Sequence, residues 1–202
     1  LSPADTLRQL ADKIFAQAAI AEYDFDEADA AVVEKLNTAN RVVSKEAYGS
    51  PALTVSFYNS TIFNAAQLKE LDAIKKQVVT LNLAKMPVTD ADIKLISGFE
   101  NLRRLNLSFT NITGAGLQDL QKLRSLKSLS LSGTNITAAQ LQQLKDLPQL
   151  KKIYAWHTAA ATADIKKLQE QLKNISFETG FNGDTTIMKL TPPVVLNEEG
   201  FV

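Results

Sequence analysis

The hexapeptide Leu102-Arg103-Arg104-Leu105-Asn106-Leu107 returns in related form every 24 residues. Apolar residues occupy the first, fourth and sixth places of each copy, and Thr-Asn-Ile-Thr follows two copies, at 110–113 and 134–137. A period of this length predicts a solenoid, in which similar units stack on one another. The other copies are Val78-Val79-Thr80-Leu81-Asn82-Leu83, Leu126-Lys127-Ser128-Leu129-Ser130-Leu131 and Leu150-Lys151-Lys152-Ile153-Tyr154-Ala155.

The two halves of the repeat have different hydrophobic periods. The first half alternates between apolar and polar residues, which is typical of a strand, whereas the second half is apolar at every third or fourth residue, which is typical of a helix. Each unit is therefore predicted to be a strand, a turn and a helix that must stack on a neighbour to bury its apolar residues. The repeated apolar positions of the second half are Val88, Ile112 and Ile136; Ala91, Ala115, Ala139 and Ala163; Ile93, Leu117, Leu141 and Ile165; and Ile96, Leu120, Leu144 and Leu168.

Less regular copies extend the array at both ends. Upstream, residues 52–57 resemble the strand phrase and are followed by Ile62 and Ala65 at the expected spacing. Two extra residues then move the predicted helix to Leu68, Leu71 and Ile74. Downstream, residues 172–177 repeat the strand phrase after an interval of 22. We expect about five units and a terminal strand, with irregular end units because they cap the stack.

The unit resembles a leucine-rich repeat, specifically the bacterial variety in which Thr takes the place usually held by Asn or Cys and is followed by Ile-Thr. The resemblance covers roughly residues 52–179 and departs from the pattern at Met86-Pro87 and at Ala159-Ala160-Ala161. It implies an α/β solenoid with parallel strands on the concave face and helices on the convex face. It also implies a module for binding other proteins, and the chain is expected to be a monomer.

A second resemblance concerns the order of segments along the chain. A helical lead-in, the Thr-type repeats and then Leu190-Thr191-Pro192-Pro193-Val194 resemble the middle region of planctomycete-type c-type cytochrome membrane proteins. This resemblance implies a periplasmic or cell-surface location. The haem chemistry of those proteins does not carry over, because the chain has no cysteine.

Three regions are predicted along the chain. In residues 1–50, a first helix begins at Ser2 and Pro3, and a second helix begins near Asp26 and runs to Leu36. We interpret this region as a helical cap over the open end of the solenoid. Residues 51–180 form the repeat domain, and 181–202 are a tail or a linker to a further domain, so that the sequence is expected to be a segment of a longer protein. The apolar stripe of the first helix comprises Leu7, Leu10, Ala11, Ile14, Phe15 and Ala18.

The repeated threonines are predicted to be structural. The residues that follow each strand stand where the chain turns inward, so their hydroxyls are expected to bond to the backbone of the next coil. The threonines that precede each helical half are expected to be N-caps. The first set is Thr110, Thr134 and Thr158, and the second is Thr89, Thr113 and Thr137.

Composition and motifs exclude several function classes. Lys plus Arg equals Asp plus Glu at 22 each, so no basic bias predicts nucleic acid or an anionic membrane, and no apolar run is long enough to span a bilayer. The single histidine, His157, has no cysteine and no second histidine to form a catalytic or metal site. With only 8 glycines there is no phosphate-binding loop, and we predict no enzyme activity and no cofactor.

Residues that point away from the core along each strand are expected to form the concave binding face. Most of them are small and polar, but the last row brings the only tryptophan and the only histidine together. Exposed rings are good anchors for a protein or a sugar. The residues predicted to contact a partner are Tyr58, Arg104, Asn106, Phe109, Lys152, Tyr154, Trp156 and His157.

Two questions stay open from the sequence. Trp156 either binds a partner or folds over the C-terminal edge, where it could also pack on Phe181. The chain as a whole is interpreted as a protein-interaction module, and the alternatives are a structural spacer between domains and a carbohydrate-binding module that uses Tyr154 and Trp156.

Overall fold

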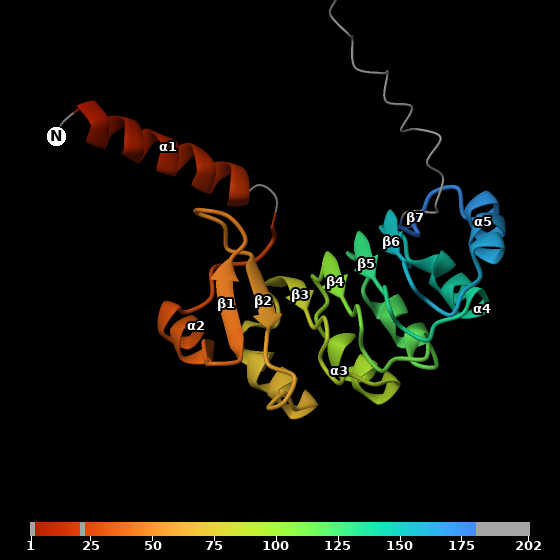
Figure 1. Cartoon of the computed structure of the whole chain (residues 1–202). Helices are drawn as coiled ribbons and strands as arrows, with labels where there is room; N and C mark the ends of the chain where they lie inside the picture. Colours follow the sequence, from red (N-terminus) through yellow and green to blue (C-terminus); the bar gives the residue numbers. More distant parts are fainter. Residues whose placement is uncertain (1–2, 21–22, 181–202) are drawn as a thin grey trace, which may run out of the picture.

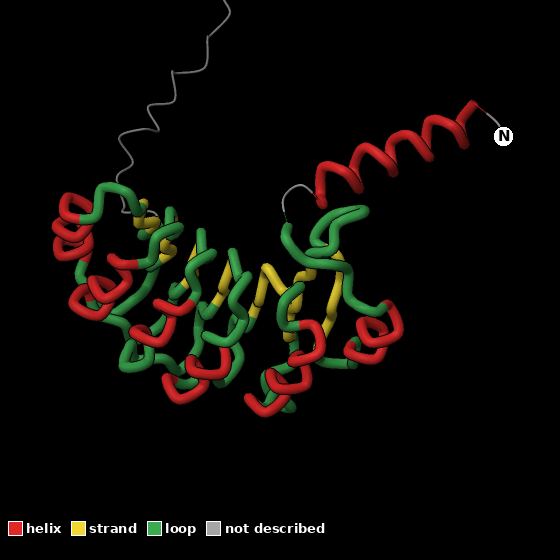
Figure 2. The backbone as a smooth tube through the Cα atoms, turned by 180° about the vertical axis from the view of Figure 1, so that it is seen from behind, coloured by secondary structure: helices red, strands yellow, loops and turns green. Residues whose placement is uncertain are grey.

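The computed structural model describes the backbone of residues 3–20 and 23–180, and the side chains of residues 5–13 and 23–180. Strands line the inner face of an arch and short helices line its outer face (Figures 1 and 2). The strands are β1 (Arg41–Lys45), β2 (Leu53–Phe57), β3 (Val78–Asn82), β4 (Arg104–Asn106), β5 (Ser128–Ser130), β6 (Lys152–Tyr154) and β7 (Ser176–Glu178). The helices are α1 (Pro3–Ile20), α2 (Ala30–Leu36), η1 (Ala65–Ile74), η2 (Asp90–Asp92), α3 (Ile93–Ile96), η3 (Leu117–Lys122), α4 (Ala138–Leu141), η4 (Gln142–Asp146) and α5 (Thr162–Gln171).

The strands form one sheet in sequence order, and every pair from β2 to β7 is parallel. Residues 24 apart are direct partners in its centre: Thr80 pairs with Arg104, and Arg104 pairs with Ser128. This register confirms the predicted α/β solenoid. The helical half of each coil is short and largely 3₁₀, designated η, because only a few residues cross the outer face before the chain returns.

The core is a set of stacked aliphatic rows. Leu81, Leu105 and Leu129 lie side by side between the sheet and the outer helices and are at most 2% exposed. The predicted rows that begin at Val88, Ile93 and Ile96 are buried as well. The alanine row that begins at Ala91 is different, because all four alanines are exposed. These alanines therefore lie on the solvent side of the outer face and do not belong to the core.

The first coil differs from its prediction at one position. Ile62 was expected in the core, but it is 52% exposed, and the adjacent Phe63 is buried in its place. The Phe63 ring meets Phe57 edge to face with centroids 5.1 Å apart. The extra residues of this coil allow the larger ring to turn inward, while Leu68 and Leu71 are buried as predicted.

The last coil has a different register from the one predicted. Phe177 pairs with Ile153, so the interval is 24 and the predicted interval of 22 is wrong. Ile175 makes the turn bond to Leu172 that Leu150 makes to Leu147 in the preceding coil. Ser176 then pairs with Lys152, which places the buried Ile175 next to Lys151 in the register.

The N-terminal end of the core is covered by α2 and by strand β1. The sequence predicted only helices there, but β1 pairs with β2 in antiparallel orientation, and Val43 is 4% exposed. Helix α2 begins at Ala30, later than the predicted start near Asp26, because Asp29 Oδ1 accepts hydrogen bonds from the backbone of Ala31 and Val32.

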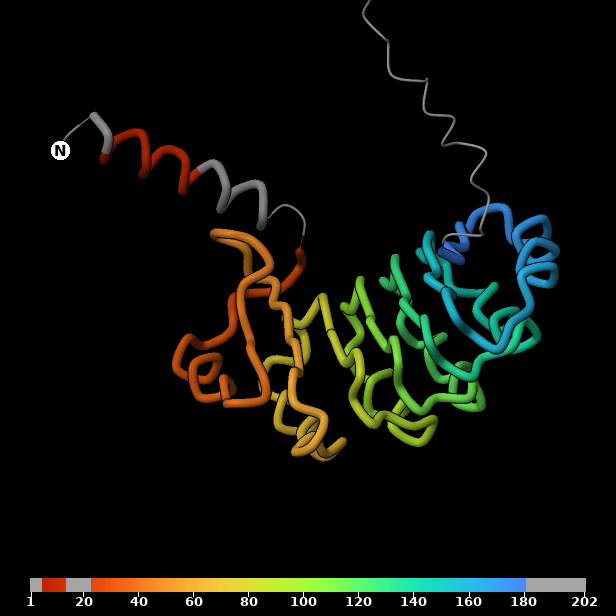
Figure 3. The backbone as a smooth tube through the Cα atoms, in the orientation of Figure 1, coloured from red at the N-terminus to blue at the C-terminus, as the bar shows by residue number. Residues whose placement is uncertain are grey.

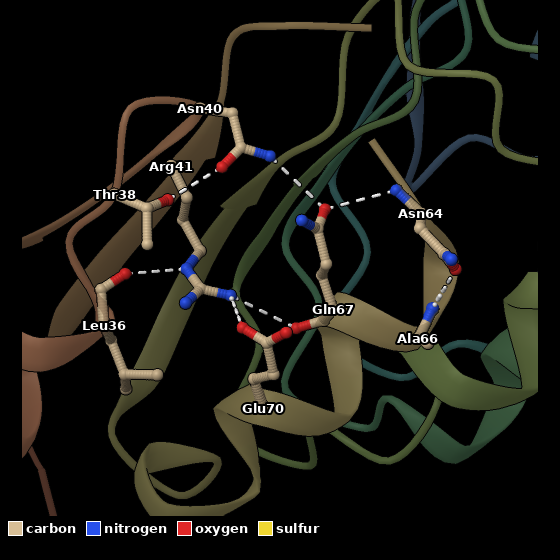
Figure 4. A network of polar contacts seen from close by, with 8 residues as sticks. All are labelled: Leu36, Thr38, Asn40, Arg41, Asn64, Ala66, Gln67 and Glu70. Atoms are coloured by element: carbon tan, nitrogen blue, oxygen red, sulfur yellow. Dashed lines mark hydrogen bonds and ion pairs between the residues drawn. The ribbon is translucent and has the colours of Figure 1, made fainter. Parts of the chain in front are cut away.

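A buried arginine ties this cap to the first repeat (Figure 4). Arg41 is 2% exposed, and its guanidinium donates to the Leu36 carbonyl at 2.8 Å and to Glu70 Oε2 at 2.9 Å. Beside it, buried Asn40 donates to Gln67 Oε1 at 3.3 Å. Since Asn40, directly before β1, and Arg41, its first residue, both bond to η1, the cap and the solenoid form one packed body.

Helix α1 does not cover the end of the solenoid. It begins at Pro3 as predicted, and it projects away from the arch (Figures 1 and 3). Leu7 is 68% exposed and Leu10 is 54% exposed, so this part of the predicted apolar stripe does not join the core. The predicted cap residue Ser2 and the side chains of Ile14, Phe15 and Ala18 lie outside the described residues.

Candidate functional site

A groove of about 510 Å³ runs along the inner face of β2 to β6. Its surface is made mainly by small polar side chains because alternate residues of each strand point away from the core. The groove contains three of the residues predicted to contact a partner, namely Arg104, Asn106 and Tyr154. The other lining residues are Thr54, Ser56, Thr80, Leu81, Asn82, Leu105, Ser128 and Ser130.

Arg104 is held in place from two sides. Its Nε donates to Thr80 Oγ1 at 3.1 Å, and its Nη2 is paired with the carboxylate of Glu46, which lies in the loop between β1 and β2. Glu46 is fixed in turn by the hydroxyl of Tyr23, which donates to Oε2 at 2.5 Å. Sequence reasoning missed this contribution of the cap because Glu46 and Arg104 are 58 residues apart.

Charges on the inner face are paired with one another. Lys152 lies 3.3 Å from Glu178, and its Nζ is 5.7 Å from the centre of the Tyr154 ring. Arg104 forms an ion pair with Glu46, so both of these cations are paired with a carboxylate. Because both residues of the Lys152–Glu178 pair are well exposed, that pair contributes little to stability. The effect of the two pairs is to make the groove polar with little net charge.

The asparagines and serines of the groove have local partners. Asn106 Oδ1 accepts from the Ser108 N–H at 3.0 Å, and Asn82 Oδ1 accepts from the Ala84 N–H at 3.1 Å. The hydroxyls of Ser108 and Ser130 are 2.6 Å apart. Ser108 and Ser132 follow their strands and are buried, because the chain turns inward directly after each strand. Asn106 therefore has a structural bond and presents only its amide nitrogen to a ligand.

The strands end in a repeated left-handed turn. Residues at intervals of 24 have positive φ values: 65° at Lys85, 57° at Phe109, 68° at Gly133 and 51° at His157. Only glycine adopts this conformation without steric cost. Phe109 and His157 are thus held in a strained backbone conformation that directs an aromatic side chain outward.

Three aromatic side chains gather at this turn, and we call Phe109, Trp156 and His157 the aromatic rim. The Phe109 and Trp156 rings meet edge to face with centroids 6.3 Å apart, and the Trp156 and His157 rings are 4.4 Å apart at 88°. Phe109 is 47% exposed and Trp156 is 44% exposed. The rim is therefore a packed cluster with about half of its ring surface open to solvent.

Two glycines make room for the rim. A Cβ atom at Gly133 would lie 2.2 Å from Phe109 Cδ1, and a Cβ atom at Gly180 would lie 2.2 Å from Trp156 Cδ1. Each ring is thus seated on the bare backbone of the next coil. Trp156 covers part of the C-terminal edge and also presents an open face, so both interpretations of this residue stand. Phe181 lies outside the described residues.

The remaining predicted contact residues lie beside these two surfaces. Tyr58 follows β2 and is 64% exposed, and its backbone N–H donates to the Asn40 carbonyl at 2.9 Å. Lys152 is on β6 next to Tyr154. The structure therefore brings six of the predicted residues together in two groups, the groove and the aromatic rim, with Tyr58 and Lys152 outside both.

The repeated threonines satisfy the backbone of their own coil. Thr110 Oγ1 donates to the Leu107 carbonyl at 2.7 Å, and Thr134 Oγ1 donates to the Leu131 carbonyl at 2.5 Å. Thr158 makes the same bond to Ala155. The predicted bond to the next coil is wrong, because the sharp turn after each strand brings the hydroxyl over a carbonyl three residues earlier. A structural role for these residues is confirmed.

The threonines that precede the helical halves differ from one another. Thr89 and Thr137 are N-caps as predicted, and each donates its N–H and its hydroxyl to the side chain three residues later. Thr113 is not an N-cap, since η3 begins after Gly116. Its N–H and hydroxyl donate to Asp90 of the preceding coil, at 2.9 and 2.7 Å.

Asp90 joins two coils through its carboxylate. Besides Thr113, it accepts from the N–H groups of Gly114 at 3.0 Å and Gly116 at 3.1 Å. Partial burial alone would raise the pKa of Asp90, but the hydroxyl and backbone donors outweigh it, and the pKa lies below its ordinary value. The corresponding residues of the next coils, Gly114 and Ala138, have no carboxylate.

Metal clusters and membrane-spanning helices are both absent from the described ranges. Residues 5–13 and 23–180 contain no group of three or more histidine, cysteine, aspartate or glutamate side chains placed to hold a metal ion. Within the same part of the chain, no helix has the length and hydropathy needed to cross a membrane.

Residues 76–136 match the family model described as leucine rich repeat. No curated protein matches the chain. Stacked repeats of this kind present an extended concave surface and are in general protein-interaction modules. The matched residues cover the coils from β3 to the turn after β5, where the 24-residue register is regular. Residues 76–136 are therefore similar to leucine-rich repeats, and the coils on either side continue the same solenoid fold.

Proposed function

We propose that this chain is a non-catalytic module that binds another protein through the groove and the aromatic rim together. The observation that carries the proposal is the rim itself. Phe109 and Trp156 remain about half exposed. The position of Phe109 is taken by Gly133 in the next coil, so the turn itself does not require a ring there. Rings that are rigid and partly open are well suited to anchor a partner because they lose little side-chain entropy on binding.

The chemistry of the surface indicates the kind of partner. The groove offers hydroxyls and amide groups, and the two cations of the inner strands already have carboxylate partners. A highly charged partner would therefore gain little from the groove. We propose an extended polar segment of low net charge that lies along the groove and inserts an apolar side chain at the rim.

We further propose that the protein is bacterial, monomeric and located in the periplasm or at the cell surface, as a segment of a larger protein. The Thr-type form of the repeat at Thr110–Thr113 and Thr134–Thr137 supports the bacterial origin, and the order of a helical lead-in, these repeats and Leu190–Val194 supports the location. Detection of the native protein in separated periplasmic, membrane and cytoplasmic fractions tests the location, and recovery from the cytoplasmic fraction alone would contradict it.

Replacement of the anchoring rings tests the binding proposal. In Tyr154→Ala/Trp156→Ala, we expect recovery of a specific partner from the native extract to fall about tenfold or more, because buried aromatic anchors each contribute about 2 kcal/mol or more at an interface. Thermal unfolding of the same variant is measured in parallel. A fall in binding with most of the stability retained supports recognition by these rings.

The matched control is Tyr48→Ala/Ile62→Ala, which removes comparable exposed apolar groups away from the groove and the rim. It should recover the partner as well as the parent chain does. Equal recovery by both variants would favour a structural spacer, whereas a large loss of stability in Trp156→Ala would show that the ring is mainly a cap. A shift of the tryptophan fluorescence with polysaccharide but not with protein would favour the carbohydrate alternative.

A further inference from the structure

A second cavity, separate from the groove, lies at the C-terminal end of the solenoid where η4 is followed by the chain leading to β6. Its volume is about 490 Å³. Its charged lining residues are Lys145, Asp146, Lys151 and Lys173, that is, three basic residues and one acidic residue. The rest of the lining comprises Leu147, Pro148, Leu150, Gln171, Leu172, Asn174 and Ile175.

The row of basic residues that contains Lys151 ends in the last coil. In the regular coils, Lys127 N–H donates to the Arg103 carbonyl, and Lys151 N–H donates to the Lys127 carbonyl. In the last coil the residue next to Lys151 in the register is Ile175, which is 4% exposed and whose N–H donates to the Leu172 carbonyl instead. The last coil therefore places an apolar residue, and no charge, beside Lys151.

The lysines that line the cavity are not neutralised by ion pairs within the described part of the chain. Lys122, Lys152 and Lys167 each lie within 3.3 Å of a carboxylate. Among the described residues, Lys145, Lys151 and Lys173 have no such pair, and Asp146 has none either. The chain has no net charge, so this local excess of positive charge is a property of the site and not of the whole protein.

We infer that this cavity, which we call the lysine pocket, binds an acidic segment of a partner protein, with glutamate or aspartate carboxylates between Lys145, Lys151 and Lys173. The amide groups of Gln171 and Asn174 supply further donors. A peptide carboxylate fits this lining better than a phosphate for two reasons. The lining has no arginine for bidentate phosphate contact, and Asp146 repels a dianion more strongly than a monoanion.

The test uses the full chain and two short fluorescein-labelled peptides, one of alternating glutamate and glycine and one with glutamine in place of each glutamate. Fluorescence anisotropy at low salt should show binding of the glutamate peptide only, and the affinity should fall as salt is added. In Lys145→Gln/Lys151→Gln/Lys173→Gln the affinity should be about tenfold lower, because the charges that attract the peptide are gone.

The matched control is Lys69→Gln/Lys94→Gln/Lys166→Gln, which changes net charge equally at exposed lysines outside the pocket. It should bind as the parent chain does. The inference is overturned if the parent chain does not bind the glutamate peptide, if both peptides bind equally, if the control loses as much affinity, or if inorganic phosphate binds more tightly through the same lysines. Partner recovery through Tyr154 and Trp156 is a separate readout, so the lysine pocket and the proposed function can fail independently.

Discussion

Leu129→Ala is expected to lower the free energy of unfolding by about 3–5 kcal/mol, the range for a fully buried leucine whose site cannot collapse. Leu129 is 0% exposed and stands in the central strand, with Leu105 and Ile153 as its partners on the two neighbouring strands. A shortened side chain leaves a cavity that both neighbours line. Each coil is stabilised mainly by its contacts with the neighbouring coils, so the substitution weakens the packing in the middle of the stack.

Urea unfolding followed by circular dichroism measures this loss. The matched control is Ile62→Ala, which removes an aliphatic side chain that is 52% exposed, and it should cost less than about 1 kcal/mol. A loss for Leu129→Ala no larger than that of the control would show that the leucine row is not the structural core.

Asp90→Ala is expected to cost about 2–3 kcal/mol at neutral pH. The carboxylate accepts four hydrogen bonds from the next coil. Its removal takes away the side-chain acceptor of the Gly114 and Gly116 N–H groups. Asp90→Asn should cost less, because the amide retains one acceptor oxygen. The difference between the two variants measures the role of the charge and the second oxygen.

The same carboxylate predicts an acid dependence of stability. The pKa of Asp90 is lowered in the folded state, so the unfolded chain takes up the proton first as the pH falls. The stabilisation from Asp90 is therefore present above its ordinary pKa of 3.8 and is lost as the pH falls through the lower folded value. Thermal unfolding between neutral pH and about pH 2 should show a steeper loss for the parent chain than for Asp90→Asn. Parallel curves for the two proteins would contradict this role.

The regular part of the fold is predictable because the same physical requirement recurs in every coil. Leu81, Leu105 and Leu129 must face the core, and residues 24 apart must stack, so the sequence period is also the strand register. The prediction failed where the chain departs from that period. The strand phrase was expected at residues 172–177, but Ile175 still belongs to the turn and β7 begins at Ser176, a local shift that no hydrophobic pattern reveals.

The candidate site was predictable only in part. The outward positions of Arg104 and Tyr154 follow from alternation along a strand, and the aromatic cluster follows from the composition of the last row. The partner of Arg104, Glu46, comes from the cap, and Asp90 reaches donors of the next coil. Both contacts join segments whose sequences carry no common pattern, so only the folded chain brings them together.

Site-specific photocrosslinking tests the central claim most directly, namely that a protein partner lies on the concave face. A benzophenone amino acid is placed at Ser130 in the groove and, in a second protein, at exposed Gln142 on the outer helix η4. Irradiation in the native extract should join a specific protein to the chain from position 130 but not from position 142, and Tyr154→Ala/Trp156→Ala should abolish that product. Crosslinking from position 142 alone, or a product at 130 that survives loss of both rings, would contradict the account.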